Sequence, residues 1–330
     1  MSHESACLKS LGRTSAAEWQ SNSGQPTQQP GDPNGPFTII AASTSGKGKI
    51  LALDNTFYDD YFNLYPQNAA LLSSALDWLT TDQYGSPPHG MGSLQFITNT
   101  ANAASFAGGI SPGAWISVFG TNLSNLPPAG RSWAASDFNG SNLPLSLSGT
   151  SVLVNGLPAA ISFVSPTQLN VQAPDDATTG TVSVVVTAPA GTAVGTSSLQ
   201  RLAPALFTLS LTGVNYVAAV ASDGSYIAPA QIPGGRPAQP GEQIEVFATG
   251  FGSGIPSQPA GMPVTPVPLS TSVTASICGQ PALVNYAGLV EPGLNQFNIT
   301  IPDVPGGMCS IVLSVQGLST QSGVMIPVGP

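Results

Sequence analysis

The second half of the sequence contains one series of blocks twice, and this repeat constrains the fold more than any other feature. Four blocks recur in the same order at offsets of 123 to 128 residues, which chance does not produce. The matching blocks are 112–125 with 240–253, 155–159 with 278–282, 168–174 with 296–302, and 180–186 with 307–313. Each copy is a little over 100 residues long, the size of one immunoglobulin-like sandwich.

The sequence within each copy is typical of β-strands. Short β-branched or alternating runs are separated by Gly, Pro, Asn and Ser, without a convincing helix. Ile116 and Val118 of the first copy are matched by Ile244 and Val246 of the second, so these positions are predicted to face the core. Trp115 alternates with them and is matched by glutamine, so it is predicted to point outward.

Changes in composition divide the 330-residue chain into five segments. The predicted fold class is mainly β, with two tandem immunoglobulin-like β-sandwiches preceded by a small α/β fragment. The segments are a flexible N-terminal stretch (1–36), the small α/β fragment (37–83), a linker (84–96), the first sandwich (97–205) and the second sandwich (206–330). Leucine and alanine at helical spacing over 68–81 predict a helix in the fragment.

The chain carries little charge, and this limits its partners and location. Only 7% of the residues are charged, and seven Lys and Arg residues cannot neutralise a phosphate backbone, so nucleic acid is excluded. No run approaches the ~20 apolar residues of a membrane helix, so no membrane span is expected. The start lacks the pattern of a signal peptide, so the protein stays inside the cell or the chain is the C-terminal part of a longer one. The polar, uncharged composition favours a secreted or cell-surface location.

Candidate catalytic and metal-binding groups are few. The two histidines, His3 and His89, lie near the N-terminus and in the linker, where neither is held rigidly enough for catalysis. The acidic group Asp54, Asp59 and Asp60 lacks the spacing of a calcium loop and is interpreted as a solvated loop. The three cysteines do not make a zinc set. We therefore expect no catalytic, cofactor or metal site, and no enzyme.

Two cysteines occur together in the second copy only. Cys278 and Cys309 fall at predicted strand positions where the first copy has Asn155 and Val182. Their joint presence predicts a disulfide, in keeping with an extracellular composition. The alternative is a pair of reduced, buried thiols.

Three aromatic residues form the candidate binding surface. Trp115 is joined by Trp133 and Phe138 in the Pro-rich loop that follows its strand. An outward aromatic ring can stack on a sugar ring or anchor a protein partner, so the expected partners are an extracellular glycan or protein. The alternative is that Trp115 packs against residues 37–96.

Each copy also has a Gln and an Asn two residues apart, just before a proline. These are Gln168 with Asn170, and Gln296 with Asn298. Their amides offer donors and acceptors that could hold a sugar or a partner strand, or satisfy backbone groups at a corner of the sandwich.

Several motifs in order resemble a known family. The runs NAASFAGGISPGAWISVFGTNLS, VLVNGLPAAISFVSPTQLNVQAP, APALFT, AQPGEQIEVFATGFG and YAGLVEPGLNQFNITIP closely resemble the Solibacter-type uncharacterised C-terminal domain family, over about 99–328. The resemblance implies paired immunoglobulin-like or IPT/TIG-like sandwiches at the end of large secreted bacterial proteins. It carries over no catalytic or binding residues.

A shorter resemblance covers residues 37–79. The runs GKGKILALDNTFYDDYF and PQNAALLSSALDWL look like the closing strand and helix of class I glutamine amidotransferase-like domains. The resemblance implies that the chain holds only the tail of such a domain, without the part that bears the nucleophile.

These observations lead to one hypothesis and two alternatives. The hypothesis is a non-catalytic extracellular or cell-surface module for display, spacing or adhesion, at the C-terminal end of a larger secreted bacterial protein. One alternative is a carbohydrate-binding module that uses the exposed aromatics. The other is a truncated amidotransferase-like enzyme or hydrolase.

Overall fold

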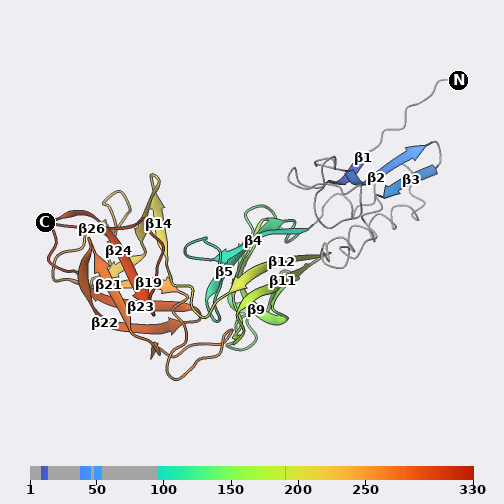
Figure 1. Cartoon of the computed structure of the whole chain (residues 1–330). Coiled ribbons are helices and arrows are strands. Elements are labelled where there is room, and N and C mark those ends of the chain that lie inside the picture. Colours follow the sequence, from blue (N-terminus) through green and yellow to red (C-terminus); the bar gives the residue numbers. More distant parts are fainter. Residues whose placement is uncertain (1–8, 14–37, 46–47, 54–94, 190) are drawn as a thin grey trace, which may run out of the picture. The chain divides into compact units, whose positions relative to one another are not determined.

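The computed structural model describes residues 9–13, 38–45, 48–53, 95–189 and 191–330 (Figure 1). The chain divides into two compact units, Met1–Leu94 and Gln95–Pro330. In the first unit, β1 (Lys9–Arg13), β2 (Thr38–Ser45) and β3 (Gly48–Leu53) form an antiparallel sheet in the order β1-β2-β3. β1 lies within the segment for which no strand was predicted. The predicted helix over 68–81, both histidines and the acidic group lie outside the described residues.

The first sandwich consists of two layers that share a strand. Its strands are β4 (Phe96–Asn102), β5 (Trp115–Thr121), β6 (Arg131–Ser132), β7 (Ser146–Leu147), β8 (Thr150–Val154), β9 (Leu157–Val164), β10 (Gln168–Gln172), β11 (Gly180–Ala188) and β12 (Gly191–Leu199). The strands pair in the order β12-β11-β8-β9-β10-β5-β4. Because β9 pairs with β10 at one end and with β8 at the other, it passes from one layer to the next.

The second sandwich repeats this order of pairing. Its strands are β13 (Ala205–Leu206), β14 (Thr208–Leu211), β15 (Val214–Val217), β16 (Ala219–Ala221), β17 (Tyr226–Ile227), β18 (Gly235–Arg236), β19 (Gln243–Thr249), β20 (Val267–Pro268), β21 (Val273–Ile277), β22 (Gln280–Glu291), β23 (Leu294–Thr300), β24 (Gly307–Val315), β25 (Leu318–Ser319) and β26 (Val324–Val328). The series β24-β21-β22-β23-β19-β16 corresponds strand by strand to β11-β8-β9-β10-β5-β4.

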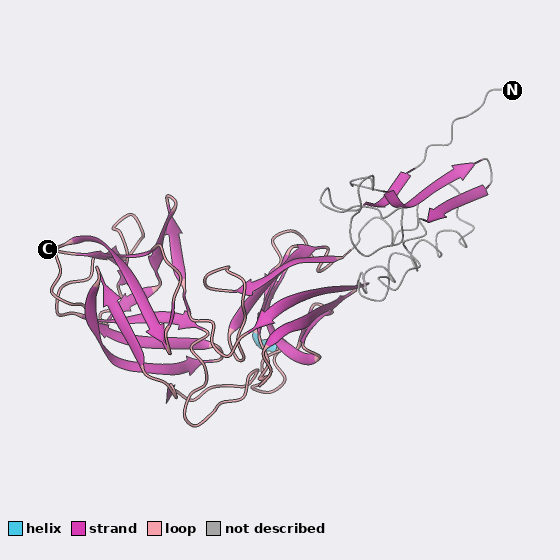
Figure 2. Cartoon of the chain, viewed as in Figure 1, coloured by secondary structure: helices cyan, strands magenta, loops and turns pink. Residues whose placement is uncertain are grey.

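The prediction of a mainly β fold with two tandem sandwiches is confirmed. Within the described ranges the one helix is a single 3-10 turn, η3 (Ala135–Asp137), among strands and loops (Figure 2). No helix long and apolar enough to cross a membrane occurs among the described residues.

The core of each sandwich follows the alternation of the sequence. Ile116, Val118, Ile244 and Val246 are all completely buried, which confirms the face predicted for them. A strand turns successive side chains to opposite faces, so the matched apolar positions of β5 and β19 meet the opposite layer. Burial of these side chains supplies roughly 1.5–3 kcal/mol each.

The hairpin between β8 and β9 and its counterpart between β21 and β22 have the same turn. Asn155 and Gly156 have φ of 51° and 77°, and Cys278 and Gly279 have φ of 51° and 74°. Positive φ at both central residues is the type I′ turn of two-residue hairpins. Cys278 therefore lies in a turn and not on a strand, which corrects its predicted position.

The two turns are held by different chemistry. Cys278 is joined to the buried Cys309 of β24 by a disulfide with an S–S distance of 2.06 Å. At the equivalent place, Asn155 donates through Nδ2 to Oδ2 of Asp176 (2.7 Å) and to Oγ1 of Thr178 (3.2 Å). Each turn is thereby fastened to the neighbouring part of its sandwich, covalently in one case and by hydrogen bonds in the other.

Candidate functional site

The three aromatic residues of the predicted binding surface lie together; we call them the aromatic cluster. Trp115 begins β5, Trp133 follows β6, and Phe138 follows η3. The ring centroids of Trp115 and Trp133 are 5.8 Å apart at an interplanar angle of 69°, and those of Trp133 and Phe138 are 5.2 Å apart at 55°. These tilted contacts are the favoured arrangement of aromatic pairs. All three side chains are half-buried.

Trp115 lies outside the core of its own sandwich, on the face predicted for it, and contacts the second sandwich. Its indole Nε1 donates to the carbonyl oxygen of Pro292 at 2.7 Å. Its backbone N–H donates to Oγ1 of Thr249 at 3.0 Å, and that hydroxyl donates to the carbonyl of Gly293 at 2.7 Å. The strand pattern gave the correct face, but a residue of the second sandwich covers that face.

The turn between β22 and β23 is shaped to receive this indole. Pro292 and Gly293 occupy its two central positions, and Gly293 has φ of +68°, which fits a type II turn. A Cβ atom on Gly293 would lie 2.8 Å from Cδ1 of Trp115 and 2.9 Å from its Nε1. Glycine at this position therefore permits both the turn and the close approach of the ring.

The aromatic cluster lines a pocket of about 570 Å³ between the two sandwiches, which we call the aromatic pocket. The rest of its lining is mostly apolar: Leu143, Phe207, Pro263, Val264, Pro292 and Leu294, with the polar residues Ser141, Ser162 and Glu291. Sequence reasoning missed the residues from the second sandwich. They lie more than 60 residues from the cluster along the chain, and no local pattern connects them to it.

Besides the hydroxyl of the exposed Ser141, two polar groups of the aromatic pocket are unpaired within the described part of the chain. Neither Nε1 of Trp133 nor the carboxylate of the exposed Glu291 makes a hydrogen bond or ion pair with other described residues. Glu291 is also the one charged residue in the lining. The pocket thus combines an apolar wall with a free indole donor, a free carboxylate acceptor and the hydroxyl of Ser141, which can donate or accept.

An ion pair fixes the loop that carries Trp133 and Phe138. Arg131 donates from its two terminal nitrogens to the two carboxylate oxygens of Asp137, each at 2.8 Å. Asp137 also accepts from the backbone N–H of Ala134 at 2.7 Å. The hydrogen bonds from Arg131, followed by that from Ala134, lower the pKa of Asp137 to about 2. The carboxylate is therefore ionised at neutral pH and holds both ends of the loop.

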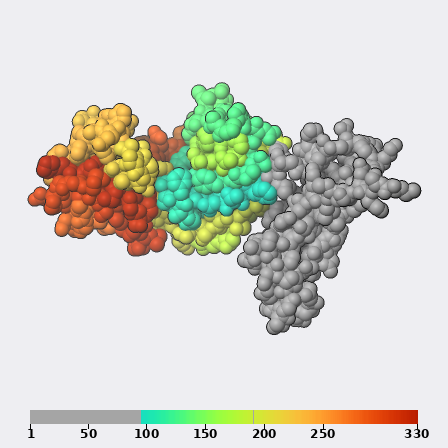
Figure 3. Space-filling model, turned by 90° about the horizontal axis from the view of Figure 1, so that it is seen from above, coloured from blue at the N-terminus to red at the C-terminus, as the bar shows by residue number. Residues whose placement is uncertain are grey.

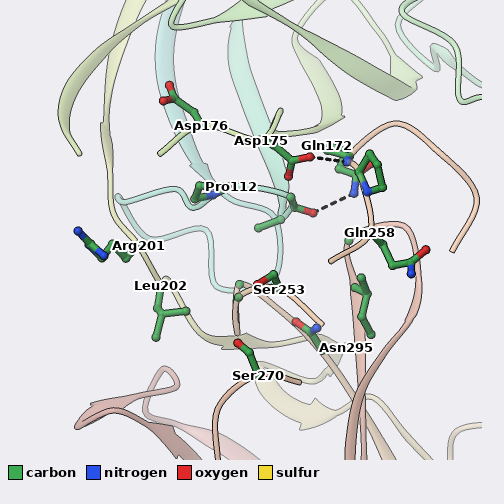
Figure 4. A pocket seen from close by; sticks show the side chains of 18 of the residues that line it. Pro112, Gln172, Asp175, Asp176, Arg201, Leu202, Ser253, Gln258, Ser270 and Asn295 are labelled. Atoms are coloured by element: carbon green, nitrogen blue, oxygen red, sulfur yellow. Dashed lines mark hydrogen bonds between the residues drawn. The ribbon is translucent and has the colours of Figure 1, made fainter. Parts of the chain in front are cut away.

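A second, polar pocket of about 450 Å³ also lies between the sandwiches (Figure 4). On one side Gln172 accepts through Oε1 from the N–H of Gly261, and Asp175 accepts through Oδ2 from the N–H of Ala260, both at 2.8 Å. Arg201 lies on the opposite side from Gln258 (Figure 4). The two hydrogen bonds tie the loop before β20 to the end of β10, so these polar groups join the sandwiches.

The repeated Gln and Asn side chains bond to each other. Nε2 of Gln168 donates to Oδ1 of Asn170 at 2.8 Å, and Nε2 of Gln296 donates to Oδ1 of Asn298 at 2.9 Å. In the first sandwich Asn170 also accepts from Oγ of Ser117 at 3.0 Å. The acceptor of each Asn is therefore used within its own sheet.

Metal-binding side chains do not gather at either pocket. Among the residues that the structure describes, no three His, Cys, Asp or Glu residues lie close enough together to hold a metal ion.

Comparison with known proteins identifies part of the first sandwich. Residues 137–202 match the IPT/TIG domain family. No curated protein sequence matches the chain.

Among solved structures, similar chains share little sequence and superpose weakly. The full extracellular region of plexin A4 is 12% identical, with 72% of this chain and 16% of that chain covered and a TM-score of 0.24. SGBP-B of the Bacteroides ovatus mixed-linkage glucan utilization locus, in complex with a mixed-linkage heptasaccharide, is 12% identical (71% and 45% covered, TM-score 0.31). The D0-D1 domain of intimin is 9% identical (70% and 99% covered, TM-score 0.20). The chain spans less than half of the first two. The family match and the strand order together show an immunoglobulin-like fold of the IPT/TIG type.

Proposed function

We propose that the chain is a non-catalytic extracellular or cell-surface module in which the two sandwiches act as one rigid spacer for display or adhesion. As part of this proposal, the chain belongs to the Solibacter-type C-terminal domain family that its sequence resembles. It would then lie at the C-terminal end of a larger secreted bacterial protein. The observation that carries it is the hydrogen bonding between the two sandwiches, whose surfaces meet in Figure 3.

The contact between the two sandwiches, which we call the junction, uses backbone groups of both. Besides the bonds of Trp115, the N–H of Leu143 donates to the carbonyl of Gly261 at 2.9 Å. Nδ2 of the buried Asn102 donates to the carbonyl of Ala203, in the connection between the sandwiches, at 2.8 Å. Opening the junction would exchange these hydrogen bonds for bonds to water, at a net cost of about 0.5–1.5 kcal/mol each. Adjacent domains usually move unless their interface is extensive, and this junction opposes such motion.

The disulfide and the composition support the location. Disulfides persist in oxidising compartments and are rare in the cytosol. A surface kept wet by Ser, Thr, Asn and Gln, with 7% charged residues in the whole chain, depends little on ionic strength. Both features suit a module outside the cell.

Rigidity is tested by measuring the distance between the sandwiches in solution. Spin labels are placed on Leu157→Cys and Leu318→Cys, two exposed hairpin positions in different sandwiches, in a Cys7→Ser background. Electron–electron double resonance should give one narrow distance distribution. Adding Trp115→Ala should broaden it, because the indole contact to the second sandwich is lost. A broad distribution in the unaltered junction would refute the rigid spacer.

Phe106→Ala is the matched control for the junction variant. Phe106 is 57% exposed and packs on Phe119, outside the junction. Its removal should leave the distance distribution unchanged. Hydrolase or amidotransferase activity of the purified chain would instead favour the alternative of a truncated enzyme.

A further inference from the structure

We propose that the aromatic pocket binds a sugar ring of a neutral glycan. This goes beyond the proposed spacer, since a rigid module needs no ligand, and the two proposals can fail separately. The pocket, of about 570 Å³, falls within the ~300–1,000 Å³ of small-molecule sites, which are mainly apolar with a few oriented polar groups.

The aromatic cluster supplies a wall that is already in place. Trp115 is fixed by its bond to Pro292, and Trp133 packs partly on the core of the first sandwich. The Arg131–Asp137 pair fixes the loop between Trp133 and Phe138. A wall that does not need to be ordered on binding loses less free energy to conformational entropy. The C–H face of a pyranose can pack on such rings in the same way as other apolar surfaces do.

The two unpaired polar groups fit the hydroxyls of a sugar. Nε1 of Trp133 can donate to a hydroxyl oxygen, and the carboxylate of Glu291 can accept from one or two hydroxyl hydrogens. A sugar ring carries hydroxyls that both donate and accept, so one ligand can form hydrogen bonds with the indole and with the carboxylate. The negative charge of Glu291, without a basic residue in the lining, disfavours sulfated or uronic-acid glycans.

The ring geometry favours a sugar over an organic cation. A site for a quaternary ammonium group needs rings that face the cation from several sides. Here the neighbouring rings contact each other, with centroids 5.8 Å and 5.2 Å apart and planes tilted by 69° and 55°, so each pair makes a tilted contact and not two faces around an open space. Rings in direct contact leave no space between them for a cation, and all three rings border the pocket from the first sandwich.

The experiment uses the full chain and an array of neutral gluco-, manno-, galacto- and xylo-oligosaccharides. A chitosan hexamer, a heparin hexamer and a decaproline peptide stand for cationic, anionic and extended peptide ligands. Neutral glycans that bind are then titrated by calorimetry. We expect neutral glycans to bind at least as tightly as chitosan, whose amino groups Glu291 attracts, and heparin and decaproline to bind weakly or not at all.

Variants locate the site. Trp133→Ala should weaken binding by about tenfold or more, as for a central aromatic contact. Trp133→Phe keeps the ring and removes the indole donor, so it should cause a smaller loss while the melting temperature stays close to that of the parent. Glu291→Gln keeps the shape of the side chain and should weaken binding a few-fold. Phe106→Ala removes an exposed aromatic outside the pocket and should have no effect.

The results that overturn the proposal are distinct. It is wrong if no neutral glycan on the array binds, or if binding survives both Trp133→Phe and Glu291→Gln unchanged. Tighter binding of chitosan, heparin or decaproline would assign the pocket to another ligand class and refute it equally. None of these results alters the distance distribution that tests the spacer.

Discussion

Replacing Gly293 by alanine tests the contact that joins the two sandwiches. The substitution adds one methyl group to a turn whose φ is +68°. The new Cβ would lie 2.8 Å from Cδ1 and 2.9 Å from Nε1 of Trp115, and 2.9 Å from the carbonyl oxygen of Gly113, closer than a Cβ atom normally approaches its neighbours. Either the turn or the indole must move, and a displaced indole loses its bond to Pro292.

The size of the effect follows from three contributions. A left-handed conformation costs a non-glycine residue about 1–2 kcal/mol. Forcing an extra methyl group into a packed contact costs about 1–3 kcal/mol. Loss of the indole hydrogen bond to Pro292 costs about 1 kcal/mol. We therefore expect Gly293→Ala to lower the free energy of unfolding by about 3–6 kcal/mol, of which roughly a third is due to φ alone.

Gly213→Ala is the control that separates the cost of the clash at Gly293 from the cost of the left-handed backbone conformation. Gly213 has φ of +81°, and no atom lies within 4 Å of the place that a Cβ atom would occupy there. The variant should therefore show only the cost of the left-handed conformation. Urea unfolding followed by tryptophan fluorescence gives both free energies. If the two substitutions destabilise equally, to within about 0.5 kcal/mol, Trp115 and the carbonyl of Gly113 do not rest against the turn and the reasoning is refuted.

Three further predictions concern other parts of the structure. Reduction of the bond between Cys278 and Cys309, or replacement of both by serine, should cost about 3–4 kcal/mol by the chain-entropy relation, and intact mass after alkylation should find both thiols blocked until reductant is added. The pKa of Asp137 is lowered from 3.8 to about 2, mainly by Arg131. The ion pair therefore stabilises the fold fully above about pH 4, and this stabilisation is lost as the pH falls towards 2. Asp137→Asn should lower the urea midpoint at pH 7, and its midpoint should equal that of the parent below about pH 2. Thr249→Val removes the hydroxyl that bridges the sandwiches and should cost about 1–3 kcal/mol, measured by the same unfolding; an unchanged midpoint would contradict the bridge.

The repeat allowed the fold to be predicted because the two copies can be compared position by position. Positions that stay apolar in both copies, such as Ile116 and Val118, are core positions, whereas a single copy leaves the two faces harder to distinguish. The same comparison could have placed Cys278 in its turn. A residue followed by glycine between two strand patterns is a hairpin signal, and Asn155 with Gly156 provides it plainly in the first copy.

The site could be predicted only in part. The sequence singled out all three members of the aromatic cluster, but the carbonyl that accepts from Trp115 lies 177 residues further along the chain. Strand alternation predicts the face on which a side chain lies, but not which residues of a neighbouring domain cover that face. Glu291 was missed for the same reason, because a lone acid in a turn looks like any solvated residue.

The two equivalent hairpins are weakened by different solution conditions, one by acid and the other by a reducing agent. In the first sandwich the hairpin is fastened through Asp176, whose pKa is lowered by the hydrogen bonds from Asn155 and Thr178. Acid that protonates this carboxylate weakens that anchor and leaves the disulfide of the second sandwich intact. A reducing agent does the reverse, since it opens the bond of Cys278 and does not act on an amide. Acid therefore loosens one half of the duplicated fold and reductant the other.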